Sequence, residues 1–215
     1  MPDFNADAFS RRQLLIGATT FATIGVIAPR RAGANVATPG ASAPPFSLVS
    51  SNGPTISLAE QRGKVVVLEW TNHDCPYVRK HYDTSNMQSL QKEATAQGVV
   101  WLTIISSAPG TQGHVSAGQA NELTKTRKAV PTAVLFDPTG VVGKAYGATN
   151  TPHMYVVTKD GTLAYAGAID DKPTTRKGDV ESAQNYVRPA LAAVAVGQPV
   201  KVPVTRAYGC TIKYA

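Results

Sequence analysis

The chain has 215 residues, of which 43% are hydrophobic and 16% are charged, and its formal net charge is +7. This composition is typical of a globular protein and excludes a disordered or fibrous chain, and the length favours a single domain. The 21 basic residues are scattered along the sequence, which argues against nucleic-acid binding. With only 2 cysteines, Cys75 and Cys210, a four-cysteine metal site and a disulfide-rich miniprotein are excluded.

The N-terminal segment 1–34 has the pattern of an export signal. The pair Arg11-Arg12 precedes an apolar stretch at 14–28, which is shorter than the ~20 residues that a membrane-spanning helix needs. Small residues follow this stretch and predict cleavage after Ala34 or Ala43. The adjacent arginines resemble a twin-arginine signal, so we expect export to the periplasm by that pathway. The alternative is an uncleaved N-terminal anchor or a mobile helix.

Cleavage of the signal would change both the charge and the surroundings of the mature chain. Removing four basic and two acidic residues lowers the formal net charge from +7 to about +5. An exported protein lies in an oxidising compartment, where disulfides persist. For the rest of the chain we expect a linker at 35–45, a domain at 46–196 and a C-terminal tail at 197–215 that carries Cys210.

Hydrophobic patterns and turn residues predict an α/β domain. Two short strands around Asn52-Gly53 predict a β-hairpin, and a continuous apolar run at 64–70 predicts a strand buried on both faces. A helical pattern at 76–96 has a weak point at 83–86, where we expect a kink or a break. The remaining elements are predicted as strands at 99–106, 132–136, 154–157 and 163–168 and as helices at 116–127, 140–146 and 181–196. Strands that alternate with helices and end in a hairpin indicate a mixed central sheet.

Cys75 is the strongest candidate for a reactive residue. The predicted buried strand ends near Trp70, and Pro76 occupies a position that proline favours at the start of a helix, which puts Cys75 near the N-cap. The free amides and the dipole at a helix N-terminus stabilise a thiolate. Arg79 adds a positive charge one turn further on, whereas Asp74 opposes ionisation. The alternatives are half of a structural disulfide or an inert buried thiol.

Several stretches together resemble the thioredoxin-like superfamily, in particular its redoxin and alkyl hydroperoxide reductase/thiol-specific antioxidant (AhpC/TSA) branch. The resemblance covers about 46–195, and its more specific stretches are 72–78 (Asn-His-Asp-Cys-Pro-Tyr-Val), 145–148 (Ala-Tyr-Gly-Ala), Thr151-Pro152, 167–171 (Gly-Ala-Ile-Asp-Asp) and 209–214 (Gly-Cys-Thr-Ile-Lys-Tyr). Together they look like a group of exported bacterial thioredoxin-family proteins. The resemblance implies a three-layer fold with a mixed central sheet flanked by helices, an N-terminal β-hairpin and a C-terminal tail.

The resemblance also implies roles for individual residues. Cys75 would be the attacking thiolate of a thiol–disulfide oxidoreductase, with Pro152 as a cis-proline facing it and Thr151 presenting its backbone to the substrate. Glu69 stands where the family has a buried acid that moves protons to and from the thiols, and the alternative is a solvated strand residue. The residues expected to stabilise the thiolate are Arg79, His73 and Asn72.

The chain departs from the family at the position of the second cysteine. Thioredoxins carry Cys-x-x-Cys, whereas the residue three positions after Cys75 is Val78. Cys210 is therefore the candidate for resolving a mixed disulfide, and the tail would have to fold back over the active-site helix. The alternative is a permanent Cys75–Cys210 bridge, which would close a long loop and act as a structural staple.

A thiol peroxidase that uses the same two cysteines is the second hypothesis. Peroxiredoxins need a threonine three residues before the cysteine and an arginine near the strand that here follows Pro152. This chain has Asn72 at the first position and no arginine at 150–155. Arg79 or Arg127 would have to reach the sulfur from elsewhere. Disulfide exchange is therefore the favoured activity.

A third hypothesis is not an enzyme but a copper or zinc carrier, or a binding module with a permanent bridge. Cys75, His73 and His153 could converge in this fold, and a thiolate with imidazoles suits either metal. The alternative for both histidines is a polar rim around the thiolate, while His81 and His114 are expected at the surface. We expect no cofactor, no nucleic-acid partner and no stable membrane span after cleavage. The expected partners are a protein disulfide or a small thiol or peroxide substrate, together with a thiol electron donor.

Overall fold

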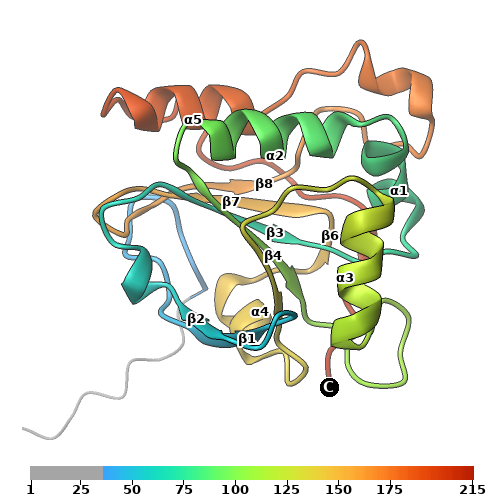
Figure 1. Ribbon diagram of the computed structural model, residues 1–215. Helices are drawn as coiled ribbons and strands as arrows, with labels where there is room; N and C mark the ends of the chain where they lie inside the picture. The colour runs from blue at the N-terminus through green and yellow to red at the C-terminus, as the bar shows by residue number, and fades with distance from the viewer. Residues whose placement is uncertain (1–35) are drawn as a thin grey trace, which may run out of the picture. The chain divides into compact units, whose positions relative to one another are not determined.

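The computed structural model describes residues 36–215, and the predicted export signal at 1–34 lies outside them. The main strands are β1 (Ser47–Ser50), β2 (Thr55–Ser57), β3 (Val66–Trp70), β4 (Val100–Ile105), β5 (Ala133–Phe136), β7 (His153–Val157) and β8 (Leu163–Gly167). They form one 7-stranded sheet in the order β2-β1-β5-β4-β3-β7-β8 (Figure 1). β3, β4 and β5 are parallel, and the outer pairs are antiparallel. The predicted mixed sheet and the N-terminal hairpin are thus confirmed.

The centre of the sheet is buried on both faces because β3 and β4 are continuous apolar runs. All 5 residues of β3 and all 6 residues of β4 are buried. Side chains alternate between the faces, so Leu68 and Trp70 pack on one side, while Val67 and Trp101 pack on the other. Burial on both faces confirms the prediction for 64–70 and requires a layer of structure on each side.

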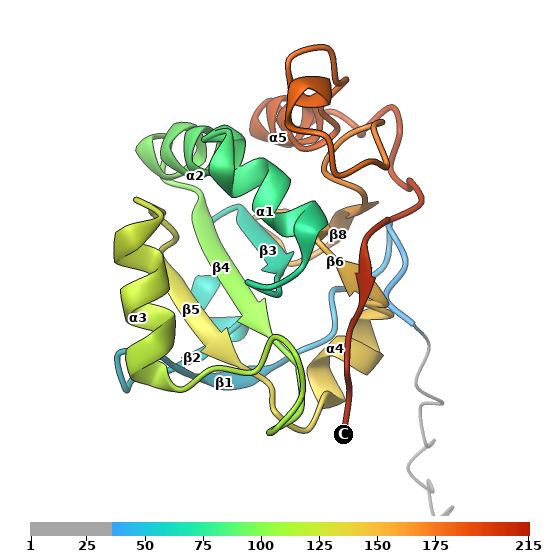
Figure 2. The same cartoon turned by 90° about the vertical axis from the view of Figure 1, so that its right-hand side faces the viewer.

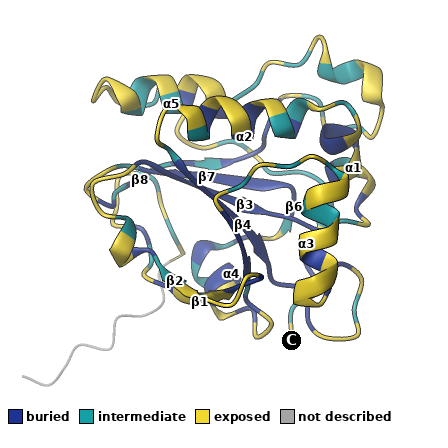
Figure 3. Cartoon of the chain, viewed as in Figure 1, coloured by how far each residue is buried: buried dark blue, intermediate teal, exposed yellow. Residues whose placement is uncertain are grey.

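Helices provide these two layers. They are α1 (Pro76–Asp83), α2 (Asn86–Ala96), α3 (Ala117–Thr126), α4 (Val141–Tyr146) and α5 (Val187–Ala195). Val78 of α1, Leu90 of α2 and Ala190 of α5 enter the core on one face, and Ala120 of α3 packs on β4 and β5 on the same face. α4 covers the opposite face (Figure 2). The sheet therefore lies buried between helices whose outer sides are exposed (Figure 3), which is the three-layer, thioredoxin-like arrangement that the resemblance implied.

The predicted weak point at 83–86 is a break between α1 and α2. Ser85 has a left-handed backbone (φ 60°) and is the N-cap of α2. A non-glycine residue in this conformation ends a right-handed helix, so the chain starts a new helix after it. α1 is consequently only 8 residues long, and it carries Cys75 at its N-terminal end.

The start of the last predicted helix, at 181, is wrong, because α5 begins only at Val187. The residues before it are held against the loop that follows β8. Tyr186 N–H donates to the Ile169 carbonyl oxygen (3.0 Å), and the residue before it forms an isolated antiparallel β-bridge with Asp170. These backbone contacts between distant segments keep this part of the chain out of the helix.

The C-terminal tail returns across the molecule to the N-terminal end of α1. Its strand β9 (Cys210–Thr211) pairs antiparallel with β6 (Asn150–Thr151) in a separate 2-stranded sheet (Figure 2). Ile212 then enters the core on the side of α4. The fold therefore places the last residues of the chain next to the segment before β7.

Within the expected linker, residues 40–43 pair with the start of β8 and the turn before it, and the Ala37 N–H donates to the Ala145 carbonyl oxygen of α4 (3.0 Å). Gly40 N–H donates to the Leu163 carbonyl oxygen (2.8 Å), and Ala43 N–H donates to the Gly161 carbonyl oxygen (2.9 Å).

Within 36–215, none of the helices has the length and apolar character needed to cross a membrane.

Candidate active site

Cys75 lies where the central strand β3 is followed by helix α1. It is the N-cap residue of α1, with an extended backbone (φ −70°, ψ 122°), and Pro76 is the first helical residue. The predicted N-cap position is thereby confirmed. Cys75 is also completely buried, with 0% of its surface exposed, so another segment separates it from solvent.

One wall of the site around Cys75 is formed by β6 and the residue after it. The Thr151–Pro152 peptide bond is cis, as the resemblance implied. The Cys75 thiol donates to the Thr151 carbonyl oxygen at 3.1 Å. The structure therefore brings together Cys75, Thr151 and Pro152, three residues that the sequence analysis singled out from distant stretches.

The segment that covers Cys75 is the tail, and it carries the second cysteine. Cys210 pairs with Thr151 in the β6–β9 ladder, and its backbone N–H donates to the Cys75 sulfur at 3.4 Å. Gly209 allows this close approach, because its φ is +125° and a Cβ there would lie 1.9 Å from the Thr151 carbonyl oxygen. Both cysteines are free thiols. The tail thus folds back as the sequence argument required, and thiol-bearing residues 135 positions apart become neighbours.

The position of Cys210 makes its thiol hard to ionise. Burial, then the hydrogen bond and charge interaction with Cys75, raise the pKa of Cys210 to about 12. A second negative charge beside a first one is costly, so two adjacent thiols lose their protons one after the other. Cys210 therefore holds its proton more tightly than an isolated cysteine does.

Glu69 is buried within the protein, so the alternative of a solvated strand residue is wrong. Its carboxylate accepts hydrogen bonds from four side chains, namely Tyr82 (2.7 Å), Trp101 (2.8 Å), Gln91 (3.1 Å) and Thr103 (3.1 Å). Burial raises the pKa of Glu69 in spite of these donors. None of the donors is a cysteine, and the carboxylate ties α1, α2 and β4 together. A role in moving protons to the thiols stays a prediction.

The residues expected to stabilise the thiolate have other partners. The Asn72 side chain accepts a hydrogen bond from the Asp74 N–H (2.9 Å), which shapes the loop before Cys75. His73 lies 3.3 Å from the Asp74 carboxylate, and burial lowers the pKa of this histidine. Arg79 is exposed on α1, and its guanidinium makes no hydrogen bond or ion pair within the described residues. Their action on the thiolate therefore stays a prediction.

Arg127, at the end of α3, holds the loop before Cys75. Its guanidinium donates to the His73 carbonyl oxygen (2.8 Å) and lies over the ring of Tyr82, 4.9 Å from the ring centre. These contacts join α3, the loop and α1.

The alternative hypothesis, in which Cys75, His73 and His153 converge on a metal ion, finds no support in the described residues. Across residues 36–215, no group of three His, Cys, Asp or Glu side chains is placed to hold a metal ion. His153 instead stacks on Tyr155, with 4.5 Å between ring centres, and burial lowers its pKa to about 4. His73 is turned toward Asp74, so the two histidines belong to different surroundings.

A buried polar cluster that the sequence analysis missed lies beside the site. His81, which was expected at the surface, is completely buried, and so is the neighbouring Lys80. Both contact the hydroxyl of Tyr208 in the tail. The one sequence signal was the position of His81 three residues after Val78, on the buried face of α1. Nothing in the sequence indicated the partner, because it lies more than a hundred residues away.

The sheet and the segments around Cys75 define the class of this protein. Parallel β3, β4 and β5 form its centre, a cysteine caps the helix after β3, and a cis-proline precedes β7. This combination defines a thioredoxin-like protein. The chain belongs to the AhpC/TSA family, whose family model matches residues 39–166.

Solved structures agree with this assignment of the fold. A hypothetical protein from Sinorhizobium meliloti is 24% identical, with a TM-score of 0.72 over 84% of this chain and 97% of that chain. An uncharacterized conserved protein from Geobacillus kaustophilus is 26% identical, with a TM-score of 0.71 over 84% of this chain and 94% of that chain. A candidate thiol:disulfide interchange protein DsbE from Chlorobium tepidum is 21% identical, with a TM-score of 0.54 over 74% and 98%. No curated protein matches the chain.

Proposed function

We propose that the protein is a thiol–disulfide oxidoreductase in which Cys75 attacks a disulfide and Cys210 resolves the mixed disulfide. The observation that carries this proposal is the contact of 3.4 Å between the Cys210 amide and the Cys75 sulfur. Membership of the AhpC/TSA family and the thioredoxin-like fold support a thiol-based activity. The raised pKa of Cys210 supports the order of the two thiols, with Cys75 acting first.

The proposed reaction passes two electrons from the protein dithiol to a substrate disulfide. The Cys75 thiolate bonds to one substrate sulfur, and the other substrate sulfur leaves as a thiolate. Cys210 loses its proton and attacks the Cys75 sulfur, which forms the Cys75–Cys210 bridge and releases the second substrate thiolate. The two released thiolates take up the two protons that the cysteines lost. A thiol donor later reduces the bridge and restores both thiols.

Movement of the tail controls access to Cys75 in this proposal. Cys75 is completely buried, so a disulfide in a partner protein reaches it only after β9 leaves β6. The strands that must separate are only 2 residues long each. A protein disulfide or a small disulfide can then enter the space that β9 occupied.

The surroundings of Cys75 favour disulfide exchange over peroxide reduction. A peroxidase needs donors placed to stabilise the displaced oxygen. The guanidinium of Arg127 is bound to the His73 carbonyl and stacked on Tyr82, and Arg79 is exposed. Neither arginine is bonded to the Cys75 thiol in this arrangement.

We place this activity in the periplasm, on the strength of the twin-arginine pattern in 1–34. An oxidising compartment supports the function, because a bridge between Cys75 and Cys210 persists there until a specific donor reduces it.

Intact-mass analysis after alkylation tests the proposal with the full chain, reduced and then mixed with glutathione disulfide. We expect the wild type to form the Cys75–Cys210 bridge and Cys210→Ser to stop at a mixed disulfide between Cys75 and glutathione. The matched variant Cys75→Ser should not accumulate that species. A wild type that forms no bridge, or a Cys210→Ser variant that gains no glutathione, overturns the proposal.

The same samples, mixed with hydrogen peroxide in place of glutathione disulfide, test the second hypothesis. If the wild type consumes peroxide faster than disulfide, and Cys75→Ser does not, a thiol peroxidase replaces the proposed function.

A further inference from the structure

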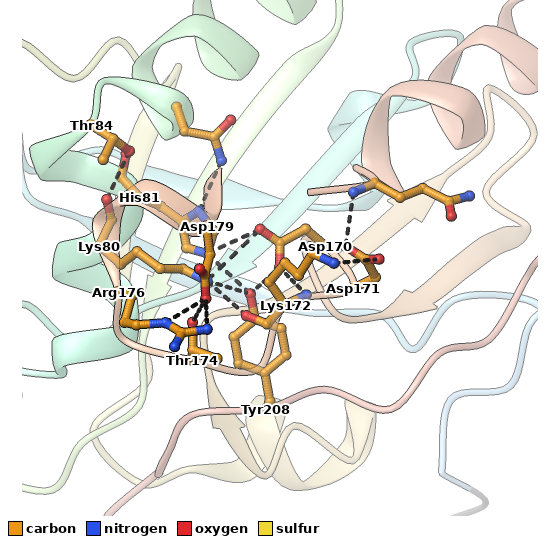
Figure 4. Close-up of polar contacts among 12 residues, drawn as sticks. Lys80, His81, Thr84, Asp170, Asp171, Lys172, Thr174, Arg176, Asp179 and Tyr208 are labelled. Atoms are coloured by element: carbon orange, nitrogen blue, oxygen red, sulfur yellow. Dashed lines mark hydrogen bonds and ion pairs between the residues drawn. The ribbon is translucent and has the colours of Figure 1, made fainter. Parts of the chain in front are cut away.

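A buried polar cluster ties the tail to the helix that carries Cys75. This latch cluster consists of Lys80 and His81 from α1, Asp170 from the loop after β8, and Tyr208 from the tail (Figure 4). Lys80, His81 and Asp170 are 1%, 0% and 2% exposed. Three segments that are far apart in the sequence therefore meet at one place, where Lys80, His81 and Asp170 are shielded from water and Tyr208 is partly buried.

The Tyr208 hydroxyl is the centre of the latch cluster. It donates to the Asp170 carboxylate, accepts from the Lys80 ammonium group (3.3 Å) and lies 3.2 Å from His81 Nε2. Because the Asn86 amide donates to His81 Nδ1 (2.8 Å), the ring hydrogen of the neutral histidine is on Nε2 and points to the hydroxyl. Burial lowers the pKa of His81 to about 3, which keeps the ring neutral. The hydroxyl thus uses its donor and both of its acceptor positions.

The tail completes a buried pair of opposite charges. Lys80 Nζ and Asp170 Oδ2 are 3.9 Å apart, too far for a hydrogen bond, and Oδ2 has no hydrogen-bond donor among the described residues. The Lys172 carbonyl oxygen accepts a further hydrogen bond from Lys80 (2.8 Å). Buried charges need hydrogen-bond partners to offset the loss of water. Tyr208 is a partner of both charges, so the charged pair favours the docked tail.

The latch cluster lies directly beside the cysteine pair. Tyr208 is two residues before Cys210, and Gly209 between them packs against the Thr151 carbonyl. The Gly209 carbonyl oxygen also accepts from the Asn150 side chain (3.1 Å). Within the described residues, the side-chain hydrogen bonds that join the tail to Pro76–Asp83 of α1 end on the Tyr208 hydroxyl, and the Cys210 N–H adds one to the sulfur of the N-cap residue, Cys75. The position of the Tyr208 hydroxyl therefore restricts where the Cys210 thiol can lie.

We infer that Tyr208 is a positioning residue, whose hydroxyl docks the tail on α1 and keeps Cys210 within reach of Cys75. The inference rests on the proposed dithiol function and adds the residue that sets the effective concentration of one thiol at the other. Tyr208 takes no part in the exchange of bonds. Without its hydroxyl, the tail spends less time against α1, and formation of the bridge becomes less favourable.

The equilibrium constant for bridge formation in glutathione buffers measures this effect on the full chain. In the reaction, the two protein thiols reduce one glutathione disulfide, which yields the bridge and two glutathione thiols. Tyr208→Phe keeps the ring and removes the hydroxyl, and we expect the constant to fall at least about tenfold, or about 30 mV for this two-electron couple. His81→Leu removes one donor to the hydroxyl and leaves no unpaired charge. It should shift the constant in the same direction by a smaller factor, and it carries the test if Tyr208→Phe does not fold.

Tyr214→Phe is the matched control. It also loses one hydroxyl hydrogen bond of the tail, but this bond ends on the Ala148 carbonyl oxygen beyond α4 (2.5 Å), so the constant should stay at the wild-type value. A merely structural role of Tyr208 would lower the urea midpoints of the oxidised and reduced forms equally and leave the constant unchanged. An unchanged constant in Tyr208→Phe, or an equal fall in Tyr214→Phe, overturns the inference while the dithiol function stands. A wild type that forms no bridge overturns the dithiol function itself.

Discussion

For single residues, burial has more influence on charge than the nearest partner does. The pKa of Glu69 is raised although four side chains donate to its carboxylate. Burial lowers the pKa of His81 to about 3 and that of His153 to about 4. Both histidines are therefore neutral in the folded protein at neutral pH, and protonation of either one opposes folding.

The pH dependence of folding stability is the consequence that we expect for His153. Between its ordinary pKa of 6.5 and about 4, the unfolded chain binds a proton that the folded chain does not. The stability from this group is therefore complete above 6.5 and is lost as the pH falls through about 4, a loss of about 3 kcal/mol. In urea unfolding, His153→Phe, which keeps a ring on Tyr155, should lose less stability than the wild type between about pH 7 and pH 4.5.

The exposed His114 provides the control for this measurement. His114→Gln should follow the wild type at every pH. Equal pH slopes of the stability for His153→Phe and the wild type would contradict the prediction, because His153 would then bind its proton in the folded chain as readily as in the unfolded chain.

Among the elements, β9 depends most on a close approach of two backbones. Gly209 has no side chain to separate it from Thr151, and its φ of +125° lies in the range that side-chain-bearing residues rarely adopt. The strand that covers Cys75 can therefore pair with β6 only because residue 209 is a glycine.

Substitution of Gly209 should uncover the active-site cysteine. In Gly209→Ala the new Cβ collides with a backbone oxygen, so β9 must move away from β6. In a Cys210→Ser background, we expect alkylation of Cys75 by iodoacetamide to become at least about tenfold faster, since a buried thiol reacts only after opening. The control is Gly197→Ala, because Gly197 also has a positive φ (+70°) but nothing within 4 Å of an added Cβ. Unchanged alkylation in Gly209→Ala would mean that the tail docks without this contact.

At the scale of the whole molecule, the two neighbouring cysteines are 135 positions apart in the sequence. A bond between them links the end of the chain to the start of α1 and encloses most of the domain. In the chain-entropy view, closing a loop of this length stabilises the folded state by as much as about 5 kcal/mol, and measured bridges often give less.

Oxidation should therefore stabilise the whole fold. We expect the oxidised wild type to be more stable to urea than the reduced wild type by about 2–4 kcal/mol. Cys210→Ser cannot form the bridge, so it should gain no stability on oxidation. An oxidised form that is no more stable than the reduced form would indicate that the bridge distorts the native arrangement of the tail.

Local patterns were enough to predict most of the elements. The apolar run in β3, the Asn52-Gly53 turn and the break in the helix at 83–86 depend on neighbours in the sequence, so each could be predicted and each is present. The same holds for Cys75, because Pro76 marks the start of the helix that it caps. The start of α5 was wrong, because its preceding residues are held by Ile169 and Asp170, which no local pattern identifies.

The contacts around the sulfur were decided by tertiary structure. That the tail lies over Cys75, that His153 turns to Tyr155 instead of the thiol, and that Tyr208 joins two buried charges all depend on residues that meet only in the folded chain. Sequence periodicity reports which side chains of one element are buried, since each element has its own repeat. It cannot report which distant group each of them contacts, because that pairing is set by how the layers pack and where the tail ends.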